Sequence, residues 1–385
     1  MTEAEAAPDE ADVVIIEWDD LKQSNSNSSL LEVMERAYGP DGTGILAIRN
    51  VPGFVQAKAA CLPLAHALAH LPADYLETEL TDATSLYNAG WSHGKEKLGN
   101  EPDYHKASFY YNPVTDLAGT PQDRVDFPLS YPANKWPSED QIPGFRTAAQ
   151  KLGCILKDAV VAVSYHIDAL AQSKVTDYPP HFLYNLMKET DKVKARLLYY
   201  YPLGLTTTNG DEVDTSTTSS IDSWIGWHND SGFLTALAGD LYVHHSHGTI
   251  VAECPDPSAG LYIVDRHNRT RHVTLPADCL AVQVGECTQI ITAGAVSATP
   301  HCVRVLQHDA TLARISLPCF VDAPPRFELT VPTSSSSREQ VLSACHPSLK
   351  VPPLGQRWTD NGMTFGAFLE QTFRMYYDWN EETKE

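Results

Sequence analysis

Hydrophobic residues recur at helical spacing through much of the first half of the chain. Residues 29–42 show an amphipathic pattern that stops at Gly and Pro, and the alanine-rich stretch 57–71 predicts a second helix. Residues 145–172 keep apolar side chains at helical spacing and give the strongest helix prediction. Residues 87–137 mix Gly, Pro, Asn and aromatic residues without a clear period, and we expect an ordered, substrate-facing wrap there.

Short strands dominate the second half. Two strands are predicted early, at 13–21 and 44–54, but the main change comes at residues 195–202, which open a series of β-rich segments reaching about Val321. Helices followed by a run of strands indicate an α+β fold, and many short strands suit a double-stranded β-helix, or jelly-roll, barrel. A C-terminal helix is predicted at 364–379.

We interpret the chain as one integrated catalytic unit in three parts. Residues 1–194 are expected to form a mixed region of helices and strands that packs on the barrel, residues 195–332 the jelly-roll core, and residues 333–385 a loop and the C-terminal helix. The polar segments 206–220 and 333–337 are predicted to be solvated loops.

Composition favours a protein that folds without crosslinks and acts on a small molecule. The chain has 385 residues, of which 43% are hydrophobic, enough for a sizeable core. Its formal net charge of -21 argues against a nucleic-acid or acidic-membrane partner. The acidic start and the lack of a long apolar run predict a cytoplasmic protein. Eight cysteines without C-x-x-C spacing are expected to be reduced thiols.

A histidine followed two positions later by an acidic residue occurs twice in the chain. His166 and Asp168 lie in the predicted long helix, where such positions point about 200° apart, so we expect a partly buried histidine and a solvated aspartate. His228 and Asp230 lie in the β-rich segment 224–237, where positions i and i+2 face the same way. His228 and Asp230 are therefore the candidate metal ligands.

A third ligand is predicted from a separate strand. His301 begins the alternating apolar run 301–306. Two imidazoles and one carboxylate on one face of an octahedron leave adjacent positions open, which is the arrangement of non-haem Fe(II) oxygenases. We therefore predict a metal site formed by His228, Asp230 and His301.

A candidate carboxylate anchor follows the third ligand. Arg314 and Ser316 form the only R-x-S in the chain and lie two positions apart on the predicted strand 313–320, so a guanidinium and a hydroxyl can converge on one carboxylate. Without a metal site before it, the arginine would be read as a surface residue on an edge strand.

With these motifs in this order, the chain resembles the isopenicillin N synthase-like branch of the 2-oxoglutarate- and Fe(II)-dependent oxygenases. Residues 225–237 resemble the first metal segment of that family, residues 260–294 its middle hairpins and residues 298–320 its closing strands. Residues 199–202 resemble its N-Y-Y-P segment. The resemblance covers most of the chain.

The resemblance implies Fe(II) at the three predicted ligands, with 2-oxoglutarate as co-substrate together with O2. It also implies that Arg314 and Ser316, with Tyr201, hold the far carboxylate of 2-oxoglutarate, and that no catalytic side chain is needed beyond the metal ligands. The implied reaction is oxidation of a small organic molecule, most commonly hydroxylation, with release of succinate and CO2.

Three features depart from the family pattern. Tyr199 stands where the family usually has Asn, Cys302 follows the third ligand where Arg is common, and residues 243–260 lengthen the gap between the second and third ligands. This insertion carries His245 and His247, which we expect to be solvated loop residues rather than a second metal site.

Other functions stay open at the level of sequence. An oxidase of the same fold would use no 2-oxoglutarate, because R-x-S can hold a substrate carboxylate instead. A jelly-roll binding protein would be catalytically silent, and a redox-inactive metal hydrolase lacks an evident general base beside the ligands. The sequence does not predict the substrate, the oligomeric state, or the choice among hydroxylation, desaturation, ring closure and demethylation.

Overall fold

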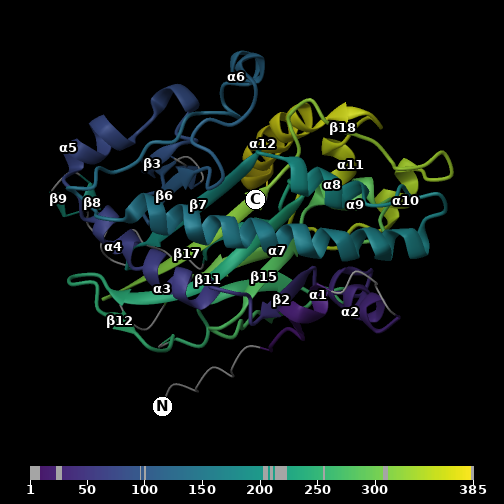
Figure 1. Cartoon of the computed structure of the whole chain (residues 1–385), viewed down its shortest axis with the longest axis horizontal. Coiled ribbons are helices and arrows are strands. Elements are labelled where there is room, and N and C mark those ends of the chain that lie inside the picture. Colours follow the sequence, from purple (N-terminus) through teal and green to yellow (C-terminus); the bar gives the residue numbers. More distant parts are fainter. Residues whose placement is uncertain are drawn as a thin grey trace.

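A nine-stranded mixed sheet, here called the large sheet, forms the centre of the molecule (Figure 1). The computed structural model describes residues 9–22, 28–95, 97–98, 101–202, 207–208, 211–212, 223–254, 256–306 and 311–382. β1 and β2 pair in parallel, and the other pairs in this sheet are antiparallel. In spatial order the strands are β1 (Val14–Glu17), β2 (Ile45–Arg49), β15 (Leu280–Val284), β11 (Leu234–His244), β17 (Leu312–Val321), β7 (Val193–Tyr200), β6 (Lys106–Tyr111) and β3 (Gly90–His93), with β12 (Ile250–Val251) beside β11.

A second, four-stranded sheet, here called the small sheet, packs against one face of the large sheet. Its strands, in spatial order, are β10 (Ser223–His228), β16 (His301–Arg304), β13 (Gly260–Val264) and β14 (Thr270–His272). A buried apolar cluster joins Tyr200 and Tyr242 of the large sheet to Trp224 and Val303 of the small sheet. Within the described residues the two sheets are hydrogen-bonded separately.

Helices cover the other face of the large sheet. The 30-residue helix α7 (Phe145–Lys174) runs across that face (Figure 1). Side chains alternate along β7, so Val193, Ala195 and Leu197 join the main core with α7, and the residues between them face the opposite way. The other helices are α1 (Trp18–Leu21), α2 (Ser28–Tyr38), α3 (Phe54–Cys61), α4 (Leu64–Ala69), α5 (Ala73–Tyr75), η1 (Leu76–Leu80), η2 (Ala83–Ser85), α6 (Pro121–Asp126), α8 (Phe182–Glu189), α9 (Glu286–Ile291), α10 (Arg338–Ser343), α11 (Leu354–Arg357) and α12 (Phe365–Glu382).

Most predicted elements are confirmed, including the α+β character. The helices predicted at 29–42, 145–172 and 364–379 correspond to α2, α7 and α12, and the one predicted at 57–71 is divided into α3 and α4. In the stretch 87–137, where an ordered wrap was predicted, β3 and β6 extend the large sheet, and the facing of this stretch toward a substrate stays a prediction. The predicted loop 206–220 falls mostly outside the described residues. Two-residue strands form the pairs β4 (Lys97–Leu98) with β5 (Glu101–Pro102), β8 (Thr207–Thr208) with β9 (Asp211–Glu212), and β18 (Glu328–Leu329) with β19 (Met363–Thr364).

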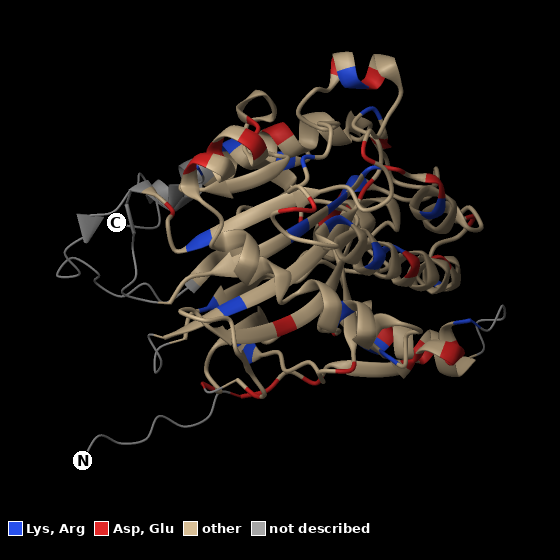
Figure 2. Ribbon diagram, turned by 60° about the vertical axis from the view of Figure 1, so that its left-hand side comes forward, with Lys and Arg blue, Asp and Glu red and all other residues tan. Residues whose placement is uncertain are grey.

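Acidic residues lie mostly on peripheral helices and loops, whereas several Lys and Arg residues lie on the central strands (Figure 2). The eight cysteines are free thiols, as predicted. Among the residues that the structure describes, no helix combines the length and apolarity needed to cross a membrane.

Candidate metal centre and carboxylate anchor

The three predicted metal ligands lie together at one end of the small sheet. β10 ends at His228, which stands opposite His301 at the start of β16. Ligand atoms of His228, Asp230 and His301 all lie within 4.8 Å of one another, and His301 Nε2 is 3.8 Å from Asp230 Oδ1. Within the described part of the chain, this is the one group of three or more His, Cys, Asp or Glu residues spaced to hold a metal ion.

Asp230 reaches this group from a turn rather than from a strand. β10 ends two residues before it, and β11 begins at Leu234. The backbone carbonyl of Asp230 accepts a hydrogen bond of 2.8 Å from the backbone N–H of Glu286. The predicted pair therefore converges, but through the fixed turn rather than through the same-face geometry of a single strand.

Hydrogen bonds at Nδ1 leave Nε2 of both imidazoles for a metal. His228 Nδ1 lies 2.8 Å from the carbonyl oxygen of Gly226, so it carries the proton there. His301 Nδ1 lies 3.1 Å from the carbonyl of Thr299 and 2.8 Å from the side-chain amide of Gln283. Burial lowers the pKa of His228 to about 4, which keeps this imidazole in the neutral form that binds metals.

Residues of the C-terminal segment hold the turn between the ligands. The hydroxyl of Tyr376, on α12, accepts a 3.1 Å hydrogen bond from the backbone N–H of Asn229. Asn229 Nδ2 donates to Glu286 Oε1 at 2.8 Å. Two nitrogens of the buried Arg357 donate to the carboxylate of Glu286. The residue between His228 and Asp230 is thus fixed through both its backbone and its side chain.

Arg314 and Ser316 are buried on β17, with exposed fractions of 4% and 8%. The Arg314 guanidinium lies 4.8 Å from the ring centroid of Tyr200 and 5.9 Å from that of Trp224, so it faces the small sheet. Its Nη2 donates to Asp240 Oδ1 at 2.6 Å, but its Nε and Nη1 have no hydrogen-bond partner in the described residues. Buried donors of this kind need an acceptor, and a carboxylate suits them.

Tyr200, not Tyr201, is the tyrosine beside this arginine. Tyr200 stands opposite Arg314 in the pairing of β7 with β17. Tyr201, one position later, contacts the ring of His93 at 4.9 Å and that of Tyr199 at 5.1 Å. Neighbouring side chains of an extended segment point to opposite faces, which explains why Tyr200 rather than Tyr201 faces the guanidinium. The contact of Tyr201 with a carboxylate stays a prediction.

The other His-x-Asp pair lies in α7 and makes hydrogen bonds to neighbouring elements of the fold. His166 Nε2 lies 2.8 Å from the carbonyl oxygen of Leu21. Asp168 accepts hydrogen bonds from the hydroxyl of Tyr178 at 2.8 Å and from two backbone N–H groups at the start of α8, at 2.9 and 2.8 Å. The expectation of a solvated aspartate is therefore wrong, because Asp168 is buried as a cap of α8.

The histidines of the insertion divide into a packed and an exposed member. His245 Nδ1 lies 2.9 Å from the hydroxyl of Tyr199, and its ring centroid is 4.8 Å from that of His70. The expectation that His245 is solvated is therefore wrong, whereas His247 is exposed as expected. Neither belongs to a group spaced for a metal ion among the residues described.

Sequence reasoning missed the residues that support the site. The turn between His228 and Asp230 is held by residues far away in the chain: Tyr376, Glu286 and Arg357. The arginine of the anchor is paired with Asp240. None of these residues carries a motif. Only Asp240 has a position that strand pairing could have suggested. It lies opposite Ser316, two residues before Tyr242, which lies opposite Arg314.

The fold and the geometry of the site define a class: the chain has the fold of the 2OG-Fe(II) oxygenases. No protein-family model matches the sequence, and no curated protein matches it significantly. Solved structures, by contrast, match over nearly the whole chain. A structure described as a 2OG-Fe(II) oxygenase family protein from Caulobacter crescentus is 17% identical, with a TM-score of 0.62, over 95% of this chain and 99% of that one.

Two further structures with bound ligands show the same likeness. A full-length protein of Neurospora crassa in complex with alpha-KG is 16% identical, with a TM-score of 0.59, over 94% of this chain and 96% of that one. JOX2 in complex with 2OG, Fe and JA is 16% identical, with a TM-score of 0.58, over 97% of this chain and 87% of that one. At this identity the likeness establishes the fold, as the motifs predicted.

Proposed function

We propose that the protein is a 2-oxoglutarate- and Fe(II)-dependent dioxygenase that oxidises a small organic molecule, chiefly by hydroxylation, and releases succinate and CO2. The observation that carries this proposal is the presence, in one fold, of a cluster of two histidines and one carboxylate and of a buried arginine with unpaired donors. The Neurospora crassa and JOX2 structures, which share the fold, were obtained with alpha-KG and with 2OG and Fe. Those ligands support the same cofactors here.

The donor set fits Fe(II). His228, Asp230 and His301 would bind the ion from one side through two imidazole nitrogens and one carboxylate oxygen, with adjacent positions left for 2-oxoglutarate and O2. Bound iron, with 2-oxoglutarate and O2, supplies the oxidising chemistry. The contribution of the side chains is to bind, to orient and to exclude water, so no separate acid or base is required.

The anchor fits the far carboxylate of 2-oxoglutarate. Arg314 offers Nε and Nη1, and Ser316 adds a hydroxyl two positions further along the same face of β17. The rings of Tyr200 and Trp224 pack against the guanidinium and keep water from it. Such a low-dielectric setting strengthens the pairing of guanidinium with carboxylate.

The arrangement of the sheets supports a single catalytic unit. We propose that the strands of the two sheets that lie in residues 195–332 form a jelly-roll barrel, with residues 1–194, which add further strands to the large sheet, packed on it, and residues 333–385 forming a loop and the C-terminal helix. The metal ligands come from the small sheet and its adjoining turn, and the anchor comes from the large sheet. A cofactor between the sheets would touch both.

An anaerobic titration with Fe(II) and then 2-oxoglutarate tests the proposal. We expect the visible charge-transfer band of an iron–2-oxoglutarate chelate, followed by succinate release when O2 is admitted. Arg314→Ala should raise the Kd of 2-oxoglutarate about 100-fold, the effect expected for losing hydrogen bonds to a charged group, and should spare Fe(II) binding. Arg374→Ala is the matched control, because Arg374 is exposed on α12. Equal loss of iron and 2-oxoglutarate in Arg314→Ala would contradict the assigned roles.

A second candidate is an oxidase of the same fold that uses no 2-oxoglutarate. The observation that favours it is the ion pair between Arg314 and Asp240, which occupies one nitrogen of the guanidinium and reduces the positive charge offered to a ligand. Iron binding without a band on addition of 2-oxoglutarate would make this the leading function. If the purified protein binds no iron at all, both candidates fail.

A further inference from the structure

Trp224, on β10, is a buried tryptophan whose indole N–H has no hydrogen-bond partner among the described residues. Only 2% of the residue is exposed, so water at the surface does not reach the ring. A buried indole N–H ordinarily finds an acceptor. Trp358, which is also buried, donates to the backbone carbonyl of Leu329 at 3.2 Å. The unpaired N–H of Trp224 therefore needs an explanation that packing alone does not supply.

The unpaired donor of Trp224 lies beside two others, Nε and Nη1 of Arg314. The guanidinium carbon is 5.9 Å from the centroid of the Trp224 ring. The ring of Tyr200 contacts both groups, with its centroid 4.8 Å from the guanidinium carbon and 4.9 Å from the centroid of Trp224. Two hydrogen bonds of about 2.9 Å each and the width of one carboxylate together span roughly 8 Å. One carboxylate is therefore large enough to accept from the indole and the guanidinium at the same time.

Apolar side chains surround these donors. Leu198 and Val303 belong to the same buried cluster as Trp224. The carboxylate beside the guanidinium is that of Asp240, whose Oδ1 accepts from Arg314 Nη2 at 2.6 Å. This ion pair uses one nitrogen and offsets part of the charge that Arg314 offers to a ligand. A further donor from Trp224 would compensate, because a hydrogen bond to a carboxylate is about twice as strong as one between neutral groups.

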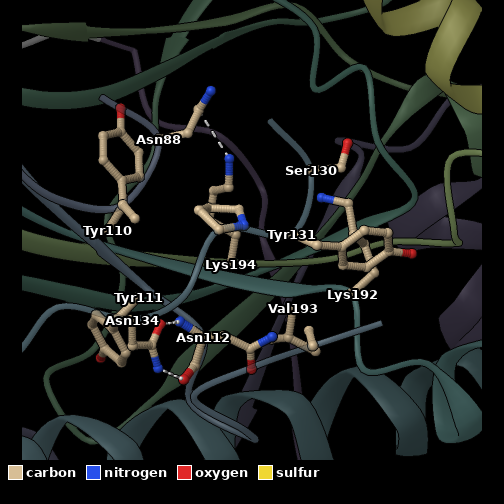
Figure 3. Close-up of a pocket in the computed structure, with 13 residues that line it drawn as sticks. Asn88, Tyr110, Tyr111, Asn112, Ser130, Tyr131, Asn134, Lys192, Val193 and Lys194 are labelled. Carbon is tan, nitrogen blue, oxygen red and sulfur yellow. Dashed lines mark hydrogen bonds between the residues drawn. The ribbon is translucent and has the colours of Figure 1, made fainter. Parts of the chain in front are cut away.

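Two buried lysines near the start of β7 show the opposite situation (Figure 3). Lys194 points toward Asn88, and its Nζ donates to Asn88 Oδ1 at 3.1 Å. Burial lowers the pKa of Lys192, and the carboxylates of Asp322 and Asp191 oppose this shift. These lysines thus have partners within the fold and create no need for a ligand. The anchor does create one, because its donors are buried and unpaired.

We propose that the indole N–H of Trp224 is a third donor of the co-substrate anchor and binds the far carboxylate of 2-oxoglutarate together with Arg314 and Ser316. This inference rests on the proposed oxygenase function. Trp224 lies on the strand that ends at the candidate metal ligand His228, so β10 would contribute to the binding of both ends of the co-substrate. A ligand that lacks the far carboxylate would gain nothing from Trp224.

The test uses the full-length protein loaded anaerobically with Fe(II), and the charge-transfer band reports the binding of 2-oxoglutarate. Trp224→Phe keeps an aromatic ring and removes the N–H. We expect the Kd of 2-oxoglutarate to rise about 10- to 100-fold, the effect of losing one hydrogen bond to a charged group, and Fe(II) affinity to stay unchanged. Trp18→Phe is the matched control, because Trp18 also has a buried, unpaired indole N–H but packs in α1 against the main core. An equal Kd in Trp224→Phe and the wild type would overturn the proposal.

A shorter analogue separates the lost hydrogen bond from a change in packing. 2-Oxobutyrate has the keto acid group that chelates iron but lacks the far carboxylate. Its Kd, titrated through the same band, should be equal in Trp224→Phe and the wild type. An equal loss of affinity for both ligands would show that the substitution disturbs packing only, and the assignment would then be wrong. Failure of the proposed function is seen separately, as a missing band in the wild type.

A measurement on the wild type makes the test independent of whether the variant folds. In protein with isotope-labelled tryptophan and Zn(II) in place of Fe(II), nuclear magnetic resonance detects the indole N–H groups of the seven tryptophans. We expect 2-oxoglutarate to shift one of these signals downfield, as a new hydrogen bond does, and 2-oxobutyrate to leave it in place. Indole signals that respond alike to the two ligands would contradict the assignment of Trp224.

Discussion

Two His-x-Asp pairs in this chain have the same residues and the same spacing but lie in different structural settings. His166 and Asp168 lie in α7, where the histidine turns to the end of α1 and the aspartate to the start of α8. His228 and Asp230 lie at and after the end of β10, where they converge with His301. In this chain a His-x-Asp pair forms a candidate metal site only where the backbone turns both side chains the same way and a third candidate ligand stands opposite.

The supports of the two pairs differ as well. Asp168 uses both of its carboxylate oxygens for three hydrogen bonds within the fold. Asp230 is held through its backbone and the neighbouring Asn229, so its carboxylate is left to face the two imidazoles. An aspartate is a candidate metal ligand where its carboxylate oxygens are not already used by hydrogen bonds within the fold.

Removal of Asp230 gives the largest expected effect. Asp230→Ala should lower Fe(II) affinity by at least about 100-fold, since loss of a residue that only hydrogen-bonds to a metal ligand already costs about 10- to 100-fold. Equilibrium dialysis against Fe(II) under anaerobic conditions measures this. Asp168→Ala is the paired control and should bind iron as the wild type does; comparable iron loss in both variants would break the comparison.

Removal of Asp168 should instead destabilise the fold. Asp168→Ala leaves three donors without their acceptor, of which the Tyr178 hydroxyl and the Leu183 N–H are buried, and should lower the free energy of unfolding by about 2–3 kcal/mol. Urea unfolding followed by circular dichroism measures the change. If the variant is as stable as the wild type, the capping role is wrong.

The hydrogen bond that α12 makes to the turn between His228 and Asp230 can be tested by removing a single oxygen atom. Tyr376→Phe removes the hydroxyl that accepts from the backbone of Asn229 and keeps the packing of the ring. We expect Fe(II) affinity to fall about tenfold, the lower end of the range for partners of this kind, with little change in stability. Tyr184→Phe, on α8 away from the turn, is the matched control. An iron affinity equal to the wild type would show that the turn holds itself.

The smallest expected effect concerns pH. Burial lowers the pKa of His166, so the folded protein takes up its proton less readily than the unfolded chain, in which histidine titrates near about 6.5. The stability associated with the neutral ring is therefore present above that value and is lost as pH falls below it. In His166→Gln the free energy of unfolding should be about 1 kcal/mol lower at neutral pH but should decline less on acidification. Urea unfolding at several pH values checks this, and identical slopes would contradict it.

The sequence predicted elements and candidate site residues correctly where the hydrophobic spacing or a motif is strong. The 30-residue α7 follows from its apolar spacing, and the grouping of the three candidate metal ligands follows from their order along the chain, although a turn rather than strand geometry brings Asp230 to the group. The tyrosine beside Arg314 was not predicted, because tyrosines stand at 199, 200 and 201, and the motif alone does not decide which of them faces inward. One position of register reverses the face of every side chain.

The support network had no such signal. Tyr376 and Arg357 reach the metal turn only through tertiary packing, which no local period predicts. The strands at 90–93 and 106–111 were missed because Gly, Pro and Asn around them weaken strand patterns, and their places are set by pairing with β7.

The hydrogen bond between Tyr376 and Asn229 joins residues 147 positions apart, and it bears on how the protein is made. A growing chain releases all three metal ligands from the ribosome well before α12 follows. Until that helix docks, the turn between two of the candidate ligands lacks one of its hydrogen bonds, although Glu286 already holds it. Under the proposed function, iron capture in the final geometry therefore follows the docking of α12.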